Sequence, residues 1–253
     1  MARFFVPEEN LREKQIVVRG DDVNHIKNVL RMVEGDVVTI SCGKGMDYVC
    51  TIAELGQDRI MLDIQEERAA ISELPVAITL FQALPKKDKM ELVIQKAIEL
   101  GASRIVPMET KRCVVKLDDK KKEKKIIRWQ AIAEAAAKQC GRGKIPEIYS
   151  VVSFEQALGM AQGLDTVIIP YELCDNMADS VQVMKEASEK RSIGIFIGPE
   201  GGFERSEVEQ SIDCGAIPIS LGKRILRTET AGLAALSVLM FLIEGKEATQ
   251  IGE

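Results

Sequence analysis

The sequence is poor in the residues that build two common kinds of active site. It contains one histidine, His25, so a Ser-His-Asp hydrolase or a multi-histidine metal centre would depend on that single side chain. Its six cysteines include no Cys-x-x-Cys pair, and a chain of 253 residues that is 46% hydrophobic needs no disulfides for stability. We therefore expect reduced thiols, no hydrolase triad and no metal site.

Long hydrophobic segments are also missing. The chain begins Met-Ala-Arg-Phe-Phe, without the apolar region of a secretory signal. The longest apolar stretch, residues 231–243, is too short to span a bilayer and is typical of a buried helix. Such a helix suits either a monomeric core or a dimer interface. These absences predict a soluble, cytoplasmic protein with no membrane segment.

Neither standard phosphate-binding loop is present. The sequence has no Gly-x-x-x-x-Gly-Lys-Ser/Thr motif, and no Gly-x-Gly-x-x-Gly motif follows the strand expected at 76–81. A nucleotide-dependent oxidoreductase is therefore disfavoured.

The charge of the chain is unevenly distributed. The net charge of −5 argues against nucleic-acid binding, but residues 111–128 hold nine basic and three acidic residues, a local +6. A basic patch of this kind suits a polyanion such as RNA. A solvated helix face explains it equally well, so the charge pattern leaves both interpretations open.

The first 72 residues have the rhythm of a small β domain. Short alternating strands are expected at 16–18, 37–40, 48–52 and 60–64, separated by turns that contain Gly and Asp. One helix is expected at 22–32, with Val23, Ile26, Val29 and Leu30 on one face. The pattern predicts a barrel-like domain over residues 1–72.

Residues 73–253 alternate between strands and helices. Strands are expected at 76–81, 104–108, 147–151, 166–170, 193–197 and 217–220, and helices at 89–100, 126–140, 154–162, 177–190, from 206 and from about 229. Ser206 with Glu209 has capping-box spacing, and Gly101 and Gly215 follow helix ends. Such repeats predict an α/β domain with a mainly parallel sheet, whose ligands bind at the carboxyl ends of its strands.

Two loops occupy such strand ends. One is Gly-Pro-Glu-Gly-Gly-Phe at 198–203, and the other is Leu-Gly-Lys-Arg-Ile-Leu-Arg-Thr-Glu-Thr-Ala at 221–231. Alone, the first is an ordinary tight turn. Two adjacent loops rich in free backbone groups favour a small polar ligand with an adenine edge and little phosphate, without selecting one such ligand.

The chain resembles the RsmE family of SPOUT-class RNA methyltransferases. The resemblance rests on Arg-Phe-Phe-Val-Pro-Glu at the start, His-Ile-Lys-Asn-Val-Leu-Arg-Met from 25, the segments 89–101, 112–118 and 128–142, and the two loops. It implies methylation of N3 of a uridine in 16S ribosomal RNA of the small subunit, with S-adenosylmethionine as methyl donor. It also implies an N-terminal PUA-like barrel, a SPOUT-type domain with a trefoil knot, and a homodimer.

The resemblance implies which residues hold the cofactor. Backbone groups of the knot loops would bind its adenine, ribose and methionine portions, with Ile197 and Leu226 beside the adenine ring. The candidates are Ile197, Gly198, Pro199, Glu200, Gly201, Ser220, Leu221, Gly222, Ile225, Leu226 and Thr228. Glycines suit such a site because a side chain would block close approach of the backbone.

The reaction suggests roles for three charged residues. The N3 proton of uridine must leave, and a guanidinium can stabilise the negative charge on the uracil oxygens, so Arg227 is the first catalytic candidate. A structural bridge from Arg227 to Glu229 or Glu200 is about equally supported. Glu200 or Glu229 could act as the base, although Glu229 also suits capping of the last helix. Glu172 is a weaker candidate.

Contacts with RNA should be made mostly by basic residues to phosphates. The candidates are Lys111, Arg112, Lys116 and Arg142 in the second domain and Arg3 and Arg31 in the first. The lysines of 120–125 rank behind these candidates, because a solvated surface explains them as well. Alternatives are a related methyltransferase acting on transfer RNA or on a ribose hydroxyl, and an RNA-binding protein without catalysis.

Overall fold

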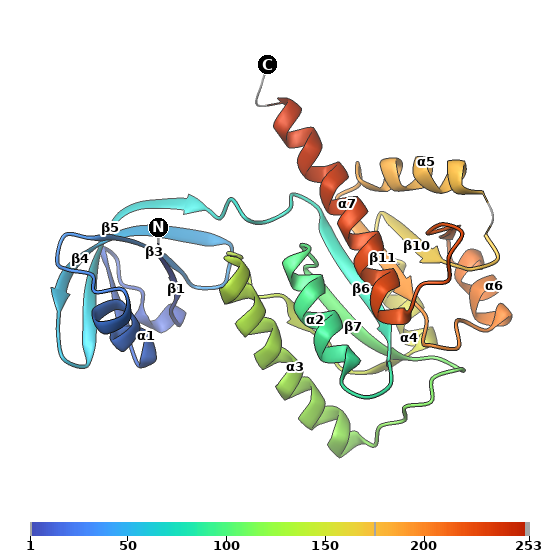
Figure 1. Cartoon of the computed structure of the whole chain (residues 1–253), viewed down its shortest axis with the longest axis horizontal. Helices are drawn as coiled ribbons and strands as arrows, with labels where there is room; N and C mark the ends of the chain where they lie inside the picture. The colour runs from blue at the N-terminus through green and yellow to red at the C-terminus, as the bar shows by residue number, and fades with distance from the viewer. Residues whose placement is uncertain (1, 175, 251–253) are drawn as a thin grey trace. The chain divides into compact units, whose positions relative to one another are not determined.

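A computed structural model describes residues 2–174 and 176–250, with side chains as far as residue 246. The chain forms two compact units. The first unit comprises residues 1–73 and 137–145, and the second comprises 74–136 and 146–253. Figure 1 shows the elements of both.

The first unit is a curled sheet of five strands in the order β1-β3-β4-β5-β2. Its strands are β1 (Arg3–Phe5), β2 (Gln15–Arg19), β3 (Val37–Ser41), β4 (Met46–Leu55) and β5 (Arg59–Ala69), and a short 3-10 turn covers Glu8–Asn10. β1 pairs with β3 in parallel, and the other pairs are antiparallel. Alternate residues such as Ile16, Val18, Ile60 and Leu62 form one buried core. The predicted strands are confirmed, and β1 is an addition.

The helix predicted at 22–32 is shorter and irregular. An α-helical turn, α1 (Asp21–Asn24), continues into a π-helical turn, η2 (His25–Val29). Val23 and Ile26 are buried as expected, but Val29 is 63% exposed and Leu30 is 43% exposed. The prediction of one apolar face was wrong because the wider π turn changes the angular spacing of the residues that follow it.

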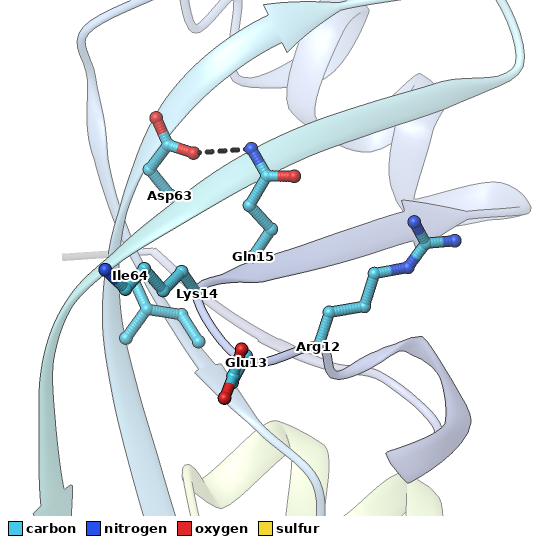
Figure 2. Close-up of a pocket in the computed structure, with 6 residues that line it drawn as sticks. All are labelled: Arg12, Glu13, Lys14, Gln15, Asp63 and Ile64. Carbon is cyan, nitrogen blue, oxygen red and sulfur yellow. Dashed lines mark hydrogen bonds between the residues drawn. The ribbon is translucent and has the colours of Figure 1, made fainter.

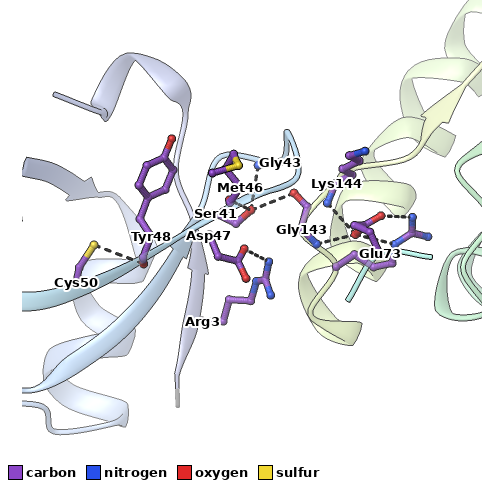
Figure 3. Close-up of polar contacts among 11 residues, drawn as sticks. Arg3, Ser41, Gly43, Met46, Asp47, Tyr48, Cys50, Glu73, Gly143 and Lys144 are labelled. Atoms are coloured by element: carbon purple, nitrogen blue, oxygen red, sulfur yellow. Dashed lines mark hydrogen bonds and ion pairs between the residues drawn. The ribbon is translucent and has the colours of Figure 1, made fainter. Parts of the chain in front are cut away.

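The first unit includes a segment that is distant in sequence. Gly143 O accepts hydrogen bonds from Gly45 N at 2.9 Å and from the Ser41 hydroxyl at 3.1 Å. Ile145 N donates to Gly43 O at 3.1 Å. Figure 3 shows this meeting of β3, the turn after it and the segment around Gly143. No periodicity in the sequence predicts the pairing, because it depends on contacts about a hundred residues apart.

The second unit contains a parallel sheet in the order β12-β10-β11-β6-β7-β8, with β9 also paired to β7. Its strands are β6 (Ala77–Ala83), β7 (Arg104–Glu109), β8 (Glu147–Ile148), β9 (Val152–Ser153), β10 (Thr166–Pro170), β11 (Ser192–Ile197) and β12 (Ala216–Ile219). Its helices are α2 (Lys89–Glu99), α3 (Asp119–Cys140, whose last residues belong to the first unit), α4 (Phe154–Ala161), α5 (Met177–Ala187), α6 (Arg205–Asp213) and α7 (Thr228–Gln250). The predicted parallel α/β architecture is confirmed.

Three local predictions in the second unit need correction. Helix α3 begins at Asp119, so it includes the lysines of 120–125, which precede the predicted start of the helix at 126. The single strand expected at 147–151 is two short ones, β8 and β9. The capping box of α6 is formed by Glu204 and Glu207 rather than by Ser206 and Glu209, since the helix starts one residue earlier.

The last helix, α7, packs beside α2 and against β11. Residues Thr228–Lys246 are long and apolar enough to cross a membrane by composition alone. Leu236 and Leu239 are nevertheless fully buried inside the second unit, whereas Phe241 is 75% exposed. One face of the helix therefore belongs to the core, and another is apolar and uncovered within this chain.

Candidate functional site

The carboxyl ends of the parallel strands bring the two predicted loops to one edge of the sheet. The loop 198–204 follows β11, and the loop 220–227 follows β12 and leads into α7. The sequence suggested that the two loops follow adjacent strands, but β10 lies between β11 and β12 in the sheet. The loop that contains Glu172 therefore also begins at this edge, and the Glu172 carboxylate lies close to Gly202.

Thr228 joins the two loops through buried hydrogen bonds. Its hydroxyl donates to Gly198 O at 2.6 Å and accepts from Gln82 Nε2 at 2.9 Å. Gln82 is the last-but-one residue of β6 and is fully buried. The sequence pattern did not single out this polar residue in an apolar strand, although its position at a strand end was a usable signal. The Thr228 side chain thus ties the start of α7 to the loop 198–204 and to β6.

Two glycines explain the shape of the loops. A Cβ on Gly198 would lie 3.2 Å from backbone atoms of Gly202 and Phe203, so the turn 198–203 closes tightly only without a side chain there. Gly222 has φ +107°, and a Cβ built on it would meet nothing within 4 Å. One glycine therefore allows a tight turn, and the other faces open space.

Backbone donors are free along the second loop. Among the described residues, the N–H groups of Ile225, Leu226 and Arg227 form no hydrogen bond. The Ile225 side chain is 93% exposed, which is unusual for an isoleucine. A loop with unpaired donors and an open glycine is suited to a polar ligand that approaches its backbone.

Lys89 connects both loops to the start of α2. Its Nζ lies 3.1 Å from a carboxylate oxygen of Glu229 and 3.7 Å from Glu200 Oε1. Glu200 Oε1 also accepts from Lys86 N at 2.9 Å. Both carboxylates considered as bases are therefore bound to one ammonium group. The sequence pattern did not single out Lys89, although it lies in the segment 89–101 that carries the resemblance.

The protonation of Glu229 follows from these contacts. Burial raises the pKa of its carboxyl, but hydrogen bonds from its own backbone N–H and from Lys89, with the nearby charge of Arg227, lower the pKa below its usual value overall. Glu229 is therefore a carboxylate at the N-terminus of α7, where a negative charge is stabilised.

Arg227 is exposed and forms no ion pair among the described residues. The bridge from Arg227 to Glu229 or Glu200, which the sequence left open, is made by Lys89 instead. The guanidinium of Arg227 is thus available at the edge of the site, next to the free backbone of Leu226.

The predicted basic residues after β7 lie against the first loop. Arg112 Nη1 donates to Gly201 O at 3.0 Å. Lys111 Nζ lies 2.9 Å from Glu204 Oε2 and 2.9 Å from the Ser206 hydroxyl. Lys116 is exposed and has no polar partner among the described residues. The turn at Lys111 and Arg112 and the loop 198–204 therefore form one polar surface.

Two arginines expected to contact RNA are enclosed in the first unit. Arg142 is 4% exposed and forms a bidentate ion pair with Glu73, at 3.2 Å from Nε and 2.6 Å from Nη2. Glu73 also accepts from Gly143 N at 2.8 Å and Lys144 N at 3.0 Å (Figure 3). The Arg142 guanidinium presents no open face to a phosphate. Its assignment to RNA contact is therefore replaced by a structural one, fastening 142–144 to Glu73.

Arg3 is also largely committed inside the first unit. Its Nη2 lies 2.5 Å from Asp47 Oδ1 (Figure 3). Its guanidinium lies over the Phe5 ring, at 5.8 Å from the ring centroid. Burial raises the pKa of the Asp47 carboxyl despite the Arg3 charge beside it. By contrast, Arg31 is exposed and adopts φ +53°, two residues after the end of the π-helical turn. Of the candidates in this unit, Arg31 is the open one.

A shallow hollow lies elsewhere in the first unit. It is lined by Arg12, Glu13, Lys14, Gln15, Asp63 and Ile64. Gln15 Nε2 donates to Asp63 Oδ1 at 2.9 Å across β2 and β5 (Figure 2). None of the candidate residues lines it. In the described part of the chain, no group of three or more His, Cys, Asp or Glu side chains is arranged to hold a metal ion.

Known proteins resemble the chain in both units. The family model of the RNA methyltransferase domain matches residues 72–240, and that of the RNA methyltransferase PUA domain matches residues 18–65. Ribosomal RNA small subunit methyltransferase E of Bacillus subtilis is 36% identical over 96% of this chain and 98% of its own length. The Synechocystis protein of that name is 31% identical, over 96% of this chain and 78% of its own length.

A solved structure shares the fold. The crystal structure of a ribosomal RNA small subunit methyltransferase E from Neisseria gonorrhoeae, bound to S-adenosyl methionine, has a TM-score of 0.79 and 32% identity, and the match covers 96% of this chain and 98% of that one. The PUA domain expected at the N-terminus is thereby confirmed, as is the methyltransferase fold that follows it. The chain belongs to the ribosomal RNA small subunit methyltransferase E family.

Proposed function

We propose that this protein transfers a methyl group from S-adenosylmethionine to N3 of a uridine in 16S ribosomal RNA. The observation that carries the proposal is the pair of strand-end loops joined by Thr228, one of which has unpaired backbone donors beside the exposed Arg227. Relatives named ribosomal RNA small subunit methyltransferase E support the substrate class, and the Neisseria structure bound to S-adenosyl methionine supports the cofactor.

The residues present fit this cofactor. Adenine offers both donors and acceptors at its edge, and unpaired backbone groups around Leu226 can pair with them. The open space at Gly222 leaves room for close approach. The proposed binding residues are Ile197, Gly198, Pro199, Glu200, Gly201, Ser220, Leu221, Gly222, Ile225, Leu226 and Thr228. We also propose that the loops 198–204 and 220–227 belong to a trefoil knot.

The cofactor, when bound, supplies a methyl group attached to a positively charged sulfur. The protein must orient the uracil so that N3 faces this methyl, and must favour loss of the N3 proton. Arg227 is the proposed catalytic residue, because its free guanidinium can donate to a uracil oxygen that becomes negative as the proton leaves.

Glu200 and Glu229 remain candidates for accepting the N3 proton. Both form ion pairs with Lys89, which favours a positioning role. For Glu229 the lowered pKa also makes the carboxylate a weaker base. If neither carboxylate accepts the proton, it passes to solvent while Arg227 stabilises the uracil anion.

The two units are proposed to share RNA recognition. In the scheme, residues 1–72 form an RNA-binding domain with Arg31 as its main contact and Arg3 as a minor one. Residues 73–253 form the SPOUT-type catalytic domain, where Lys111, Arg112 and Lys116 contact phosphates. The lysines of 120–125, now part of helix α3, extend the same basic segment. The substrate is either free 16S RNA or the small ribosomal subunit, in the cytoplasm.

A homodimer completes the proposal. Phe241 and Val238 on α7 and Val181 and Met177 on α5 are apolar side chains that remain exposed in the second unit. Helices α5 and α7 contact one another, so these residues belong to neighbouring elements. An apolar surface of this kind is typical of an interface between identical subunits.

The experiment uses small ribosomal subunits from cells that lack this gene. Purified protein and methyl-labelled S-adenosylmethionine are added, and the labelled nucleoside is identified by mass. Label in 3-methyluridine is the expected result. Label in another nucleoside would overturn the proposed target atom. Cofactor binding without label would point to another substrate, and absence of cofactor binding would favour an RNA-binding protein without catalysis.

A further inference from the structure

Glu207 is a buried carboxylate that the proposed reaction does not use. It lies in the first turn of α6 and is 2% exposed. No lysine or arginine forms an ion pair with it among the described residues. A carboxylate taken out of water without an ion pair needs strong hydrogen-bond donors in return.

The donors that satisfy Glu207 come from two different loops. Its Oε2 accepts from Glu204 N at 2.8 Å, where the loop 198–204 enters α6. Its Oε1 accepts from Lys111 N at 2.8 Å, in the turn after β7. One side chain thus joins the backbone of the candidate cofactor loop to the backbone of the candidate RNA turn.

The other contacts between these segments lie at the surface. Lys111 reaches Glu204 with a side chain that is 57% exposed, and the exposed Arg112 reaches Gly201 O. Exposed polar contacts contribute little to fixing a loop, because water competes for each group. Buried contacts of Thr110 and Cys113 anchor the turn to β6 and β7, and the bonds to the buried Glu207 carboxylate are the ones able to fix it relative to the loop 198–204.

We propose that Glu207 is a positioning residue that presents Lys111 and Arg112 to RNA from a fixed place beside the cofactor loop. The inference rests on the proposed function, since it assigns the two side chains to RNA. Its consequence is that the RNA-contacting turn and the loop 198–204 are ordered together, before either ligand binds.

The test compares Glu207→Gln with Glu209→Gln. The first variant keeps the size of the side chain but replaces one acceptor oxygen with an NH₂ donor, so one of the two backbone N–H groups loses its acceptor. The second changes an exposed glutamate of the same helix that pairs with Arg205. It is the matched control for loss of one negative charge.

Amide hydrogen exchange gives a readout that does not depend on activity. In Glu207→Gln, exchange in a peptide covering residues 109–116 should accelerate about tenfold, whereas Glu209→Gln should match the wild-type protein. Unchanged exchange in Glu207→Gln would overturn the inference, whatever the enzyme acts on.

Kinetics then separate positioning from general stability. Glu207→Gln should raise the KM for small ribosomal subunits about tenfold, with kcat changed less than about threefold at a temperature where the variant stays folded. Adding Arg112→Ala to it should have little further effect, because a displaced arginine is already lost to RNA. Full additivity would contradict the inference. An inactive wild-type protein would instead contradict the proposed function. The exchange result would then still decide whether Glu207 orders the turn.

Discussion

Two candidate arginines of the first unit and two of the second carry the same charge but have different surroundings in the structure. Arg142 and Arg3 in the first unit are held by Glu73 and Asp47, which are themselves largely buried. Arg227 and Arg112 in the second unit are exposed, and neither forms an ion pair among the described residues. The difference shows that a basic residue in a family motif can serve folding or binding, and that its partner decides which.

The largest effect on stability is expected from removal of a buried, ion-paired arginine. Arg142→Ala leaves the Glu73 carboxylate buried without its cation, which typically costs about 3–5 kcal/mol. Urea unfolding followed by circular dichroism should show that the first unit unfolds at a lower urea concentration than in the wild-type protein. Fluorescence of Trp129, which is buried in the second unit, should report a transition close to that of the wild-type protein.

Lys44→Ala is the control for this variant. Lys44 pairs with Glu8 at an exposed position of the same unit, so its loss should leave the urea midpoint of the first unit nearly unchanged. If Arg142→Ala were as stable as the control and bound ribosomal RNA less tightly, Arg142 would be a contact residue after all.

The same ion pair should make the first unit sensitive to acid. Burial raises the pKa of Glu73, but Arg142 and the backbone N–H groups of Lys144 and Gly143 outweigh it, so the folded pKa lies below 4.5. A lowered folded pKa means that the stabilisation is complete above about pH 4.5 and is lost as the pH falls through the folded value. Glu73→Gln should be less stable at pH 7 and lose less stability on acidification. If the urea midpoints of the wild-type protein and of Glu73→Gln fall by the same amount between pH 7 and pH 3, the Glu73–Arg142 ion pair does not cause the acid sensitivity.

The next effect concerns an open arginine. Arg227→Ala should lower kcat about 100-fold, the usual consequence of removing a donor that stabilises negative charge in a transition state. Because Arg227 has no ion pair to lose among the described residues, unfolding and the cofactor Kd should change little. Methyl transfer to small subunits and calorimetric titration of the cofactor measure the two separately.

Arg224→Ala is matched to this variant, since Arg224 is exposed in the same loop. It should change KM a few-fold and leave kcat nearly intact. A loss in kcat of similar size in both variants would mean that the loop needs positive charge in general and not a guanidinium at position 227.

A smaller effect is expected at Lys89. This residue is intermediate between the buried, paired arginines and the exposed, unpaired ones, because it is partly exposed and forms ion pairs. Lys89→Met removes the ammonium shared by Glu200 and Glu229 and leaves two carboxylates near the cofactor loops. The cofactor Kd should rise about tenfold, equivalent to about 1.4 kcal/mol, and Lys89→Arg should recover most of it. Lys96→Met, which breaks a pair with Glu99 on the same helix, should leave the Kd unchanged. An unchanged Kd in Lys89→Met would show that the loops keep their geometry without the bridge.

The sequence predicted the architecture better than it predicted the role of single side chains. Strand and helix periods indicated the parallel sheet, and the same periods placed the two loops at strand ends. Local patterns succeed here because each element shows its own period. Apolar residues recur at every second position in a strand and at every third or fourth position in a helix. The irregular turn at 25–29 escaped them, because a single π turn leaves almost no trace in the spacing of apolar residues.

Pairings across long distances in sequence could not be predicted in this way. Arg142 meets Glu73 and Lys111 meets Glu207 because segments 69 and 96 residues apart are brought together. Glu207 in particular has the sequence context of an ordinary surface residue on an acidic helix, and only its two backbone donors distinguish it. The role of a side chain that depends on a distant partner can be assigned only once the fold is known. A feature that depends on local spacing can be predicted from the sequence.

The smallest effect should separate an open lysine from one that is engaged. Lys116 is exposed without a polar partner among the described residues, whereas Lys111 reaches Glu204 and Ser206. If Lys116 neutralises a phosphate, Lys116→Ala should weaken RNA binding about threefold at moderate salt and reduce the slope of log Kd against log salt by about one. Lys111→Ala should change the slope less, because its charge is partly neutralised within the protein. Equal slopes for both variants would mean that Lys111 leaves Glu204 when RNA binds, and that the distinction between open and engaged cations does not persist in the complex.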